Sequence, residues 1–379
     1  PFIFFVSLVS LLAGVLNSLG RFAETAAMPI ILNMCLIISL MFGEHIMETP
    51  AHILSVAISV AGFIQLVLLY WVCQKAGYRI KIRRPKLTPR IKKLLIIMGP
   101  AALGAGVIQL NLLLDMIIAS HLPDASMSYL YYADRLNQLP IGVIGVALGT
   151  VLLPFLSRSI ANGDEAQVMK SQNQAIELCL FFTIPAAVAF LVIPFDLVGV
   201  LFERSNFSPE ATIQTSLTLA AYATGLPAYV LAKVFVTGYF ARGDTKSPLK
   251  FAVVCLIINV ALNIILMQYF VHVGLAIATS ISAWVNVLML CGGLILRGHY
   301  GIEKKLINRL LKFTLCSLFM GVVLWFVQKQ VHFFIKGETY QQIFGLIILI
   351  FSGIAAYIIA TFTTQAVKKD ELRDLFSKG

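Results

Sequence analysis

The chain has 379 residues, of which 59% are hydrophobic and 12% are charged, whereas about a quarter of the residues in soluble proteins are charged. This composition excludes an ordinary soluble domain. The net charge of +11 leaves two partner classes, nucleic acid and anionic lipid, and the positions of the charges decide between them.

Hydrophobic runs long enough to cross a bilayer recur along the whole chain, because a hydrocarbon core about 30 Å thick needs roughly 20 helical residues. Polar and apolar residues do not alternate in these runs, which favours helices over the strands of a membrane barrel. The sequence therefore predicts an all-α polytopic membrane protein with about 11 transmembrane helices. The expected spans are 1–17, 26–43, 51–74, 94–120, 127–156, 171–193, 211–240, 248–269, 273–296, 306–328 and 340–365.

Two connections are longer than the turns between the other spans. Residues 75–93, KAGYRIKIRRPKLTPRIKK, form a basic linker, and residues 194–210 are apolar enough to lie at a membrane interface. The chain opens on PFIFFVSLVSLLAGVLNSLG, without Met and without the charged start of a signal peptide. We therefore expect a fragment that begins inside a longer protein.

The basic residues of the connections gather on one side of the predicted topology. If the linker 75–93 is cytoplasmic, only Arg204, Lys329 and Lys336 among these basic residues face the other side. Cytoplasmic loops of membrane proteins carry such an excess of Lys and Arg. The pattern predicts a cytoplasmic C-terminus, and it assigns the net charge to anionic lipid rather than to nucleic acid. It also places residue 1 outside, so an odd number of preceding spans is expected.

The segment YYADRLNQLPIGVIGVALGTVLLPFL, residues 131–156, carries charge inside a predicted span. Ionised groups at membrane depth cost about 2.5–3.5 kcal/mol, so they are candidates for function. Five residues share one helical face because they recur at spacings of three and four: Arg135, Gln138, Gly142, Gly145 and Gly149. Arg135 either faces an aqueous cavity and binds an anion bidentately, or pairs with Asp134 or another helix and only stabilises the bundle.

Other polar residues lie in later spans. Asp115 stands alone among apolar neighbours, and Asn259, Asn263 and Thr279 follow in the spans 248–269 and 273–296. Carboxylate, amide and hydroxyl oxygens suit a monovalent cation, whereas the alternatives are hydrogen bonds between helices and proton exchange by Asp115. Lys233 either lines the same cavity as Arg135 or extends its ammonium to the membrane interface.

Motifs for catalysis are missing from the sequence. The six cysteines stand singly in apolar runs without metal-ligand spacing, and no nucleophile–base arrangement, phosphate loop or nucleotide motif occurs. We therefore expect neither an enzyme nor a pump driven by its own ATPase.

YYADRLNQLPIGVIGVALGTVLLPFLSR resembles the signature helix of the MurJ (MviN) lipid II flippases, within the multidrug/oligosaccharidyl-lipid/polysaccharide exporter superfamily. The segments MGPAALGAGVIQLN, FARGDTKSPLK and FVSLVSLLAGVLNSLGRF also resemble that family. The resemblance implies a two-lobed V of 14 spans, of which this chain would hold the fourth to the fourteenth. The expected domains are the remainder of the N-terminal lobe (1–74), a basic cytoplasmic linker (75–93), the C-terminal lobe (94–300), and a C-terminal helix pair with its tail (301–379).

The resemblance also implies a function in the bacterial inner membrane. The cargo would be lipid II, an undecaprenyl-pyrophosphate-linked disaccharide pentapeptide, flipped by alternating access, with membrane lipids and the cell-wall synthesis machinery as partners. The alternatives are another exporter of the superfamily, either a drug/cation antiporter or an O-antigen-type flippase, and a non-transporting scaffold for envelope assembly.

Site residues are implied position by position. Arg135 matches an essential cavity arginine, and we expect Asp134, Gln138 and Lys233 to bind substrate with it, although some relatives have Glu where Gln138 stands. Some relatives bind sodium, and Asn263 stands where those relatives have a second Asp. The residues matching the sodium pattern are Asp115, Asn259, Asn263, Thr279 and, through its carbonyl, Leu275.

Overall fold

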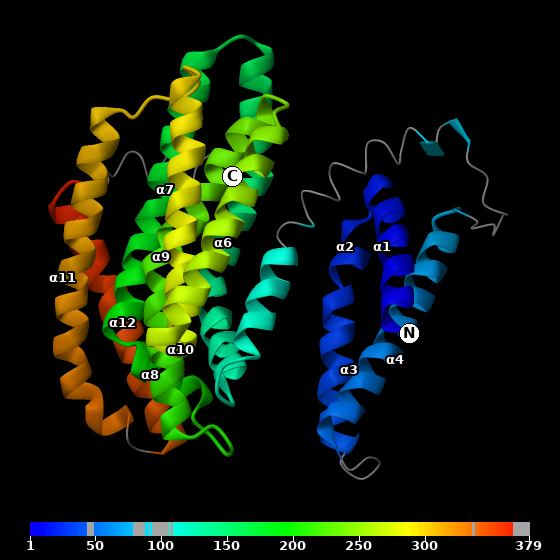
Figure 1. Ribbon diagram of the computed structural model, residues 1–379, viewed down its shortest axis with the longest axis horizontal. Helices are drawn as coiled ribbons and strands as arrows, with labels where there is room; N and C mark the ends of the chain where they lie inside the picture. Colours follow the sequence, from blue (N-terminus) through cyan, green and yellow to red (C-terminus); the bar gives the residue numbers. More distant parts are fainter. Residues whose placement is uncertain are drawn as a thin grey trace. The chain divides into compact units, whose positions relative to one another are not determined.

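The computed structural model describes residues 1–43, 49–78, 88–89, 91–92, 106, 109–335 and 338–366. All regular secondary structure in these residues is helical, which confirms the all-α prediction. The chain divides into two compact units, Pro1–Lys93 and Leu94–Gly379 (Figure 1). The division falls at the end of the expected basic linker, and the finer domain boundaries stay predictions.

The first unit is built around one long helix. Its helices are α1 (Phe2–Ser18), α2 (Phe22–Ala26), α3 (Met28–Gly43) and α4 (Pro50–Lys75). Helix α4 packs against both α1 and α3, and Leu16 and Leu69 are fully buried between these helices. The Gln65 amide donates a hydrogen bond of 2.8 Å to the carbonyl oxygen of Met28 at the start of α3. This buried polar contact fixes the height of α4 against α3.

The second unit places one helix among four others. Its helices are α6 (Ser126–Ala161), α7 (Glu165–Val192), α8 (Pro194–Phe202), α9 (Pro209–Ala241), α10 (Lys246–Leu296), α11 (Lys304–Ile335) and α12 (Thr339–Thr363). Helix α9 packs against α6, α7, α8 and α10, while α11 and α12 pair with each other and α11 also packs on α7 (Figure 1). Helix α9 therefore forms the centre of this unit.

The segment α10 consists of two helices joined as a hairpin. Val271 has φ 52° and ψ −127°, which is far from helical, and the chain reverses there. The Ser282 hydroxyl donates to the carbonyl of Cys255 at 2.8 Å, so the two halves lie antiparallel. This geometry agrees with the separate spans expected at 248–269 and 273–296.

Gly225 of α9 allows a close helix crossing, and the hydrogen bonds of the region converge on its partner in α10. A Cβ atom at Gly225 would lie 2.8 Å from the Cα atom of Ser280. The Ser280 hydroxyl donates to the carbonyl of Ala221 at 2.9 Å, and the Trp284 indole donates to that of Thr224 at 3.0 Å. Small residues at helix crossings in membranes allow backbones to approach in this way.

In the described part of the chain, seven helices are long and apolar enough to cross a membrane. The α10 hairpin is counted as one of these seven. The apolar helices α1 and Gln109–Ala119 are shorter and are not counted. Most of the expected span 94–120 lies outside the described residues. The total of about 11 spans and the V shape therefore stay predictions.

Ion pairs tie together the expected cytoplasmic ends of the second unit. Arg242, at the end of α9, lies 2.8 Å from Glu165 of α7. Arg297, at the end of α10, lies 2.6 Å from Asp244 in the α9–α10 turn, and it also donates to the Ser247 hydroxyl at 2.8 Å. These contacts connect three helices at one end of the unit.

We expect Asp244→Asn to remove part of the acid sensitivity of folding. Burial by itself would raise the pKa of Asp244. The hydrogen bonds that Asp244 accepts from Ser247 and Arg297, together with the positive charge of Arg297, outweigh this effect and lower the pKa to about 2. Because an unfolded Asp titrates near 4, its ionised form contributes stability above about pH 4 that is lost as the pH falls through 2. Thermal unfolding in detergent between these pH values measures the difference. The control Asp124→Asn should keep the wild-type slope, and an unchanged slope in Asp244→Asn would contradict the expectation.

Candidate functional site

Arg135 extends from α6 without an acidic partner. Its side chain is exposed, and its guanidinium carbon lies 4.6 Å from the centre of the Tyr131 ring. Among the described residues, no carboxylate lies within ion-pair distance of this guanidinium. Asp134 instead accepts a hydrogen bond from the Gln138 amide. Residues four apart share a helix face and adjacent residues do not, which explains why Gln138 rather than Arg135 reaches Asp134.

The face of α6 below Arg135 is open at the one glycine whose surroundings are described. No described atom lies within 4 Å of the position that a Cβ atom would take at Gly142. The surroundings of Gly145 and Gly149 lie outside the described residues. Within the described residues, space beside α6 is therefore shown at Gly142 alone, and the aqueous groove stays a prediction.

Lys233 is exposed on α9. Its backbone carbonyl accepts a hydrogen bond of 2.8 Å from the Thr237 hydroxyl. No hydrogen bond or ion pair among the described residues joins Lys233 to Arg135. Their shared cavity therefore stays a prediction.

The structure brings all five residues of the expected cation site into one hydrogen-bonded chain. The Asn263 amide donates to Asp115 Oδ1 at 2.6 Å and to Asn259 Oδ1 at 3.1 Å. The Asn259 amide donates to Thr279 Oγ1 at 3.4 Å, and the Thr279 hydroxyl donates to the carbonyl of Leu275 at 2.9 Å. The chain of contacts thus joins the helix Gln109–Ala119 to both halves of the α10 hairpin.

The chemistry of this cluster is that of hard oxygen ligands around one negative charge. Asn259 and Asn263 are 2% and 0% exposed, and Asn263 Oδ1 is buried without a hydrogen-bond partner in the described residues. Asp115 Oδ2 accepts a further bond of 3.2 Å from Asn111. The amide of Asn263 therefore has an unused oxygen beside a carboxylate, and a turned amide would present that oxygen to a cation.

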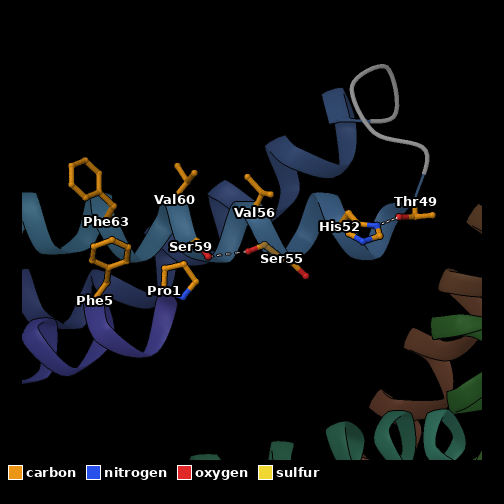
Figure 2. A pocket seen from close by; sticks show the side chains of 9 residues that line it. All are labelled: Pro1, Phe5, Thr49, His52, Ser55, Val56, Ser59, Val60 and Phe63. Atoms are coloured by element: carbon orange, nitrogen blue, oxygen red, sulfur yellow. Dashed lines mark hydrogen bonds between the residues drawn. The ribbon is translucent and has the colours of Figure 1, made fainter.

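A pocket of about 890 Å³ lies on the first unit (Figure 2). Its lining residues belong to α1 and α4 or directly precede these helices. Phe5, Val60 and Phe63 supply apolar lining, while Ser55 and Ser59 supply hydroxyls. These hydroxyls bond to carbonyls of their own helix, Ser55 to Ala51 at 2.8 Å and Ser59 to Ser55 at 3.1 Å. The serines are satisfied locally, so they do not by themselves indicate a polar ligand. Sequence reasoning passed over this pocket because α4 reads as a uniform apolar span.

Comparison with known proteins gives consistent matches. A family model described as "Lipid II flippase MurJ" matches residues 1–367. A probable lipid II flippase MurJ of Rhizobium meliloti is 40% identical over 328 residues, which are 86% of this chain and 61% of the relative. One of Rhizobium tropici is 37% identical over 380 residues, which are 98% of this chain and 71% of the relative.

Among solved structures, "Lipid II flippase MurJ, inward closed conformation" matches with a TM-score of 0.77 and 26% identity. The match covers 99% of this chain and 73% of that chain. The chain thus spans between 61% and 73% of the length of these three proteins.

Proposed function

The chain belongs to the MurJ family of lipid II flippases, and from this membership we propose that the protein translocates lipid II across the bacterial inner membrane by alternating access. The head group would move from the cytoplasmic to the periplasmic face, with the C-terminus in the cytoplasm. The family match over residues 1–367 carries the proposal. The unpaired Arg135 on α6 supports it, because a polyprenyl pyrophosphate needs a cation at membrane depth.

Arg135 is proposed to bind the pyrophosphate of the cargo. A guanidinium presents a planar fork of donors that matches two phosphate oxygens at once. The central carbon of the guanidinium lies 4.6 Å from the centre of the Tyr131 ring. This contact leaves the N–H groups at the guanidinium edge available. No described carboxylate lies within ion-pair distance of the guanidinium, so an anionic ligand does not have to displace an ion-pair partner. The polyprenyl tail would remain in lipid beside α11 and α12.

Sodium is proposed to bind at the cluster of Asp115, Asn259, Asn263, Thr279 and the Leu275 carbonyl, and to bias the transport cycle. The residues fit such an ion in two respects. The atoms that could coordinate it are oxygens, and Asn263 Oδ1 is buried without a hydrogen-bond partner among the described residues. Asp115 and both halves of the α10 hairpin already meet there. A bound cation would therefore stabilise the contact between the helix Gln109–Ala119 and α10.

We expect sodium to raise the thermal stability of the full-length protein and Asp115→Asn to abolish that effect. Ligand binding stabilises the folded state by RT ln(1 + [L]/Kd), which is about 1.4 kcal/mol at ten times Kd. The measurement is the unfolding temperature in NaCl against KCl at equal ionic strength. Asp244→Asn, which removes a carboxylate outside the cluster, should keep the sodium effect. Equal unfolding temperatures in both salts for the wild type would rule the site out.

Reconstitution of the full-length protein tests the proposed function. Fluorescent lipid II in proteoliposomes should become accessible on the opposite leaflet faster than in protein-free vesicles, and unlabelled lipid II should compete. Cationic drugs should not compete with the labelled lipid. Drug transport without lipid II translocation would indicate an antiporter, translocation of other lipid-linked oligosaccharides alone would indicate an O-antigen-type flippase, and no transport of either would favour a scaffold.

A further inference from the structure

A second pocket, of about 650 Å³, lies in the second unit where α6 begins, α8 ends and α9 begins. Its volume is in the range of small-molecule sites, about 300–1,000 Å³. On α6 the lining ends at Tyr132, which is three residues, or about 4.5 Å along the helix, from Arg135. The predicted topology places this end of the unit on the periplasmic side. A head group that leaves Arg135 outward would reach this pocket next.

The pocket is arranged to attract an anion. Arg204 lines it, and its Nη2 atom is anchored on the carbonyl of Val200 at 3.2 Å, which leaves other guanidinium donors available. The N-terminal ends of α6 and α9 also line it, through Ala125 and Ala211. The Ser208 hydroxyl caps α9 by accepting a hydrogen bond of 3.2 Å from the Ala211 N–H, whereas no side chain in the described residues caps the first turn of α6. Unpaired N–H groups and the helix dipole favour negative charge at an uncapped end such as that of α6.

The acidic side chains of the same connection are engaged elsewhere. Glu203 accepts a hydrogen bond of 2.7 Å from the Thr212 hydroxyl, and Glu210 accepts one of 2.6 Å from the Gln214 amide. Neither residue lines the pocket. No described carboxylate lies within ion-pair distance of Arg204.

One wall of the pocket is aromatic and packed in place. The Tyr132 ring lies 4.9 Å from that of Phe202 and 5.2 Å from that of Phe207, measured between ring centres. Tyr129 is backed by the ring of the buried His272 at 5.1 Å. Ser205, between Phe202 and Phe207 in the chain, has a left-handed φ of 52°. Such backbone strain is retained where the surrounding structure requires it. Rigid rings provide flat apolar surface to a ligand at low entropic cost.

We propose that this pocket binds a carboxylate-bearing glycopeptide on the periplasmic side. Arg204 and the uncapped N-terminal end of α6 would hold the carboxylate, and the aromatic wall would pack against the sugar or the peptide. The identity of the ligand rests on the proposed function, because the disaccharide pentapeptide of lipid II supplies a sugar and peptide carboxyl groups on one molecule. The pocket would then be the place where the translocated head group rests before release.

Binding of a water-soluble muramyl pentapeptide to the full-length protein in nanodiscs tests this site. Arg204→Gln should raise Kd at least about tenfold, the equivalent of one charge-assisted contact. Lys329→Gln, which removes another cation of the expected periplasmic side from outside the pocket, should leave Kd unchanged. Amidation of the peptide carboxyl groups should weaken wild-type binding by a similar factor, and it should have little further effect on Arg204→Gln. Phe207→Leu keeps apolar bulk without a ring and should also weaken binding.

Several results would overturn the proposal. These are wild-type affinity in Arg204→Gln, equal binding of the amidated ligand, and equal binding of a pentapeptide without its sugar. Equal competition by inorganic phosphate would reduce the pocket to a general anion site and would also overturn it. Lipid II translocation in the same preparation separates this site from the proposed function. Translocation without glycopeptide binding removes only the pocket, whereas binding without translocation removes only the flippase.

Discussion

Replacing Arg135 by Ala is expected to lower the rate of lipid II translocation by the full-length protein about tenfold to a hundredfold. Hydrogen bonds to charged groups contribute about 1.5–3 kcal/mol each, and 1.4 kcal/mol corresponds to a factor of ten. Arg135 has no acidic partner in the described residues, so its removal does not leave a carboxylate unpaired. The loss should therefore appear in transport rather than in stability. Arg135→Lys should retain the charge but lose the paired donors, and it should give an intermediate rate.

The matched control is Arg158→Ala, since Arg158 is also an exposed arginine of α6 but lies in its last turn. It should translocate lipid II like the wild type. Translocation by Arg135→Ala at the wild-type rate would show that the residue does not bind cargo. A fall in unfolding temperature that parallels the fall in rate would show that Arg135 stabilises the bundle instead.

Gly274→Ala is expected to destabilise the protein by about 3 kcal/mol, at the upper end of the usual penalty for overpacking. A Cβ atom at this position would overlap the carbonyl group of Leu266, with its carbonyl carbon at 2.6 Å. Backbone atoms cannot rotate away as a side chain can, so the two halves of the α10 hairpin would have to separate. The unfolding temperature in detergent and the yield of folded protein measure this effect.

Gly292→Ala provides the control within the same hairpin. No described atom lies within 4 Å of a Cβ atom at Gly292. Its substitution should change stability by about 0.5 kcal/mol or less, or increase it slightly through better helix propensity. Equal unfolding temperatures for the two variants would mean that the hairpin is looser than described. Because the hairpin carries Asn263 on one half and Thr279 on the other, Gly274→Ala should also remove the response to sodium.

The membrane helices could be predicted from sequence because length and hydropathy are local properties. The break between the two halves of α10 was placed correctly, since Val271 and Gly274 fall where one apolar span ends and the next begins. Asp115 and Asn263, which are 148 positions apart, were grouped from their oxygen chemistry as polar residues of apolar spans, whereas the Leu275 carbonyl was added only through the family resemblance, because no local pattern marks a backbone carbonyl.

Other contacts could not be anticipated because they depend on how helices cross. Gly225 allows close packing against Ser280 of α10, and nothing in the sequence around a single glycine identifies the partner helix. The hydrogen bond from the Gln138 amide to Asp134 was not expected, and the binding of substrate by Gln138 stays a prediction. The pocket at Tyr132, Arg204 and Phe207 draws its lining from two separate segments of the chain, 125–132 and 201–211, and a connection read alone gives no sign of it.

The short turn of the α10 hairpin bears on how the protein is inserted during synthesis. Tyr269, Phe270 and Val271 carry no charge, so little polar material has to pass through the bilayer when the turn crosses it. On the predicted topology, Lys246 and Arg297 lie at the two open ends on the side of synthesis, where positive charge opposes passage across the bilayer. The two halves are therefore suited to leave the insertion machinery as a pair. They would already be joined by the Ser282–Cys255 bond before the rest of the unit assembles around them.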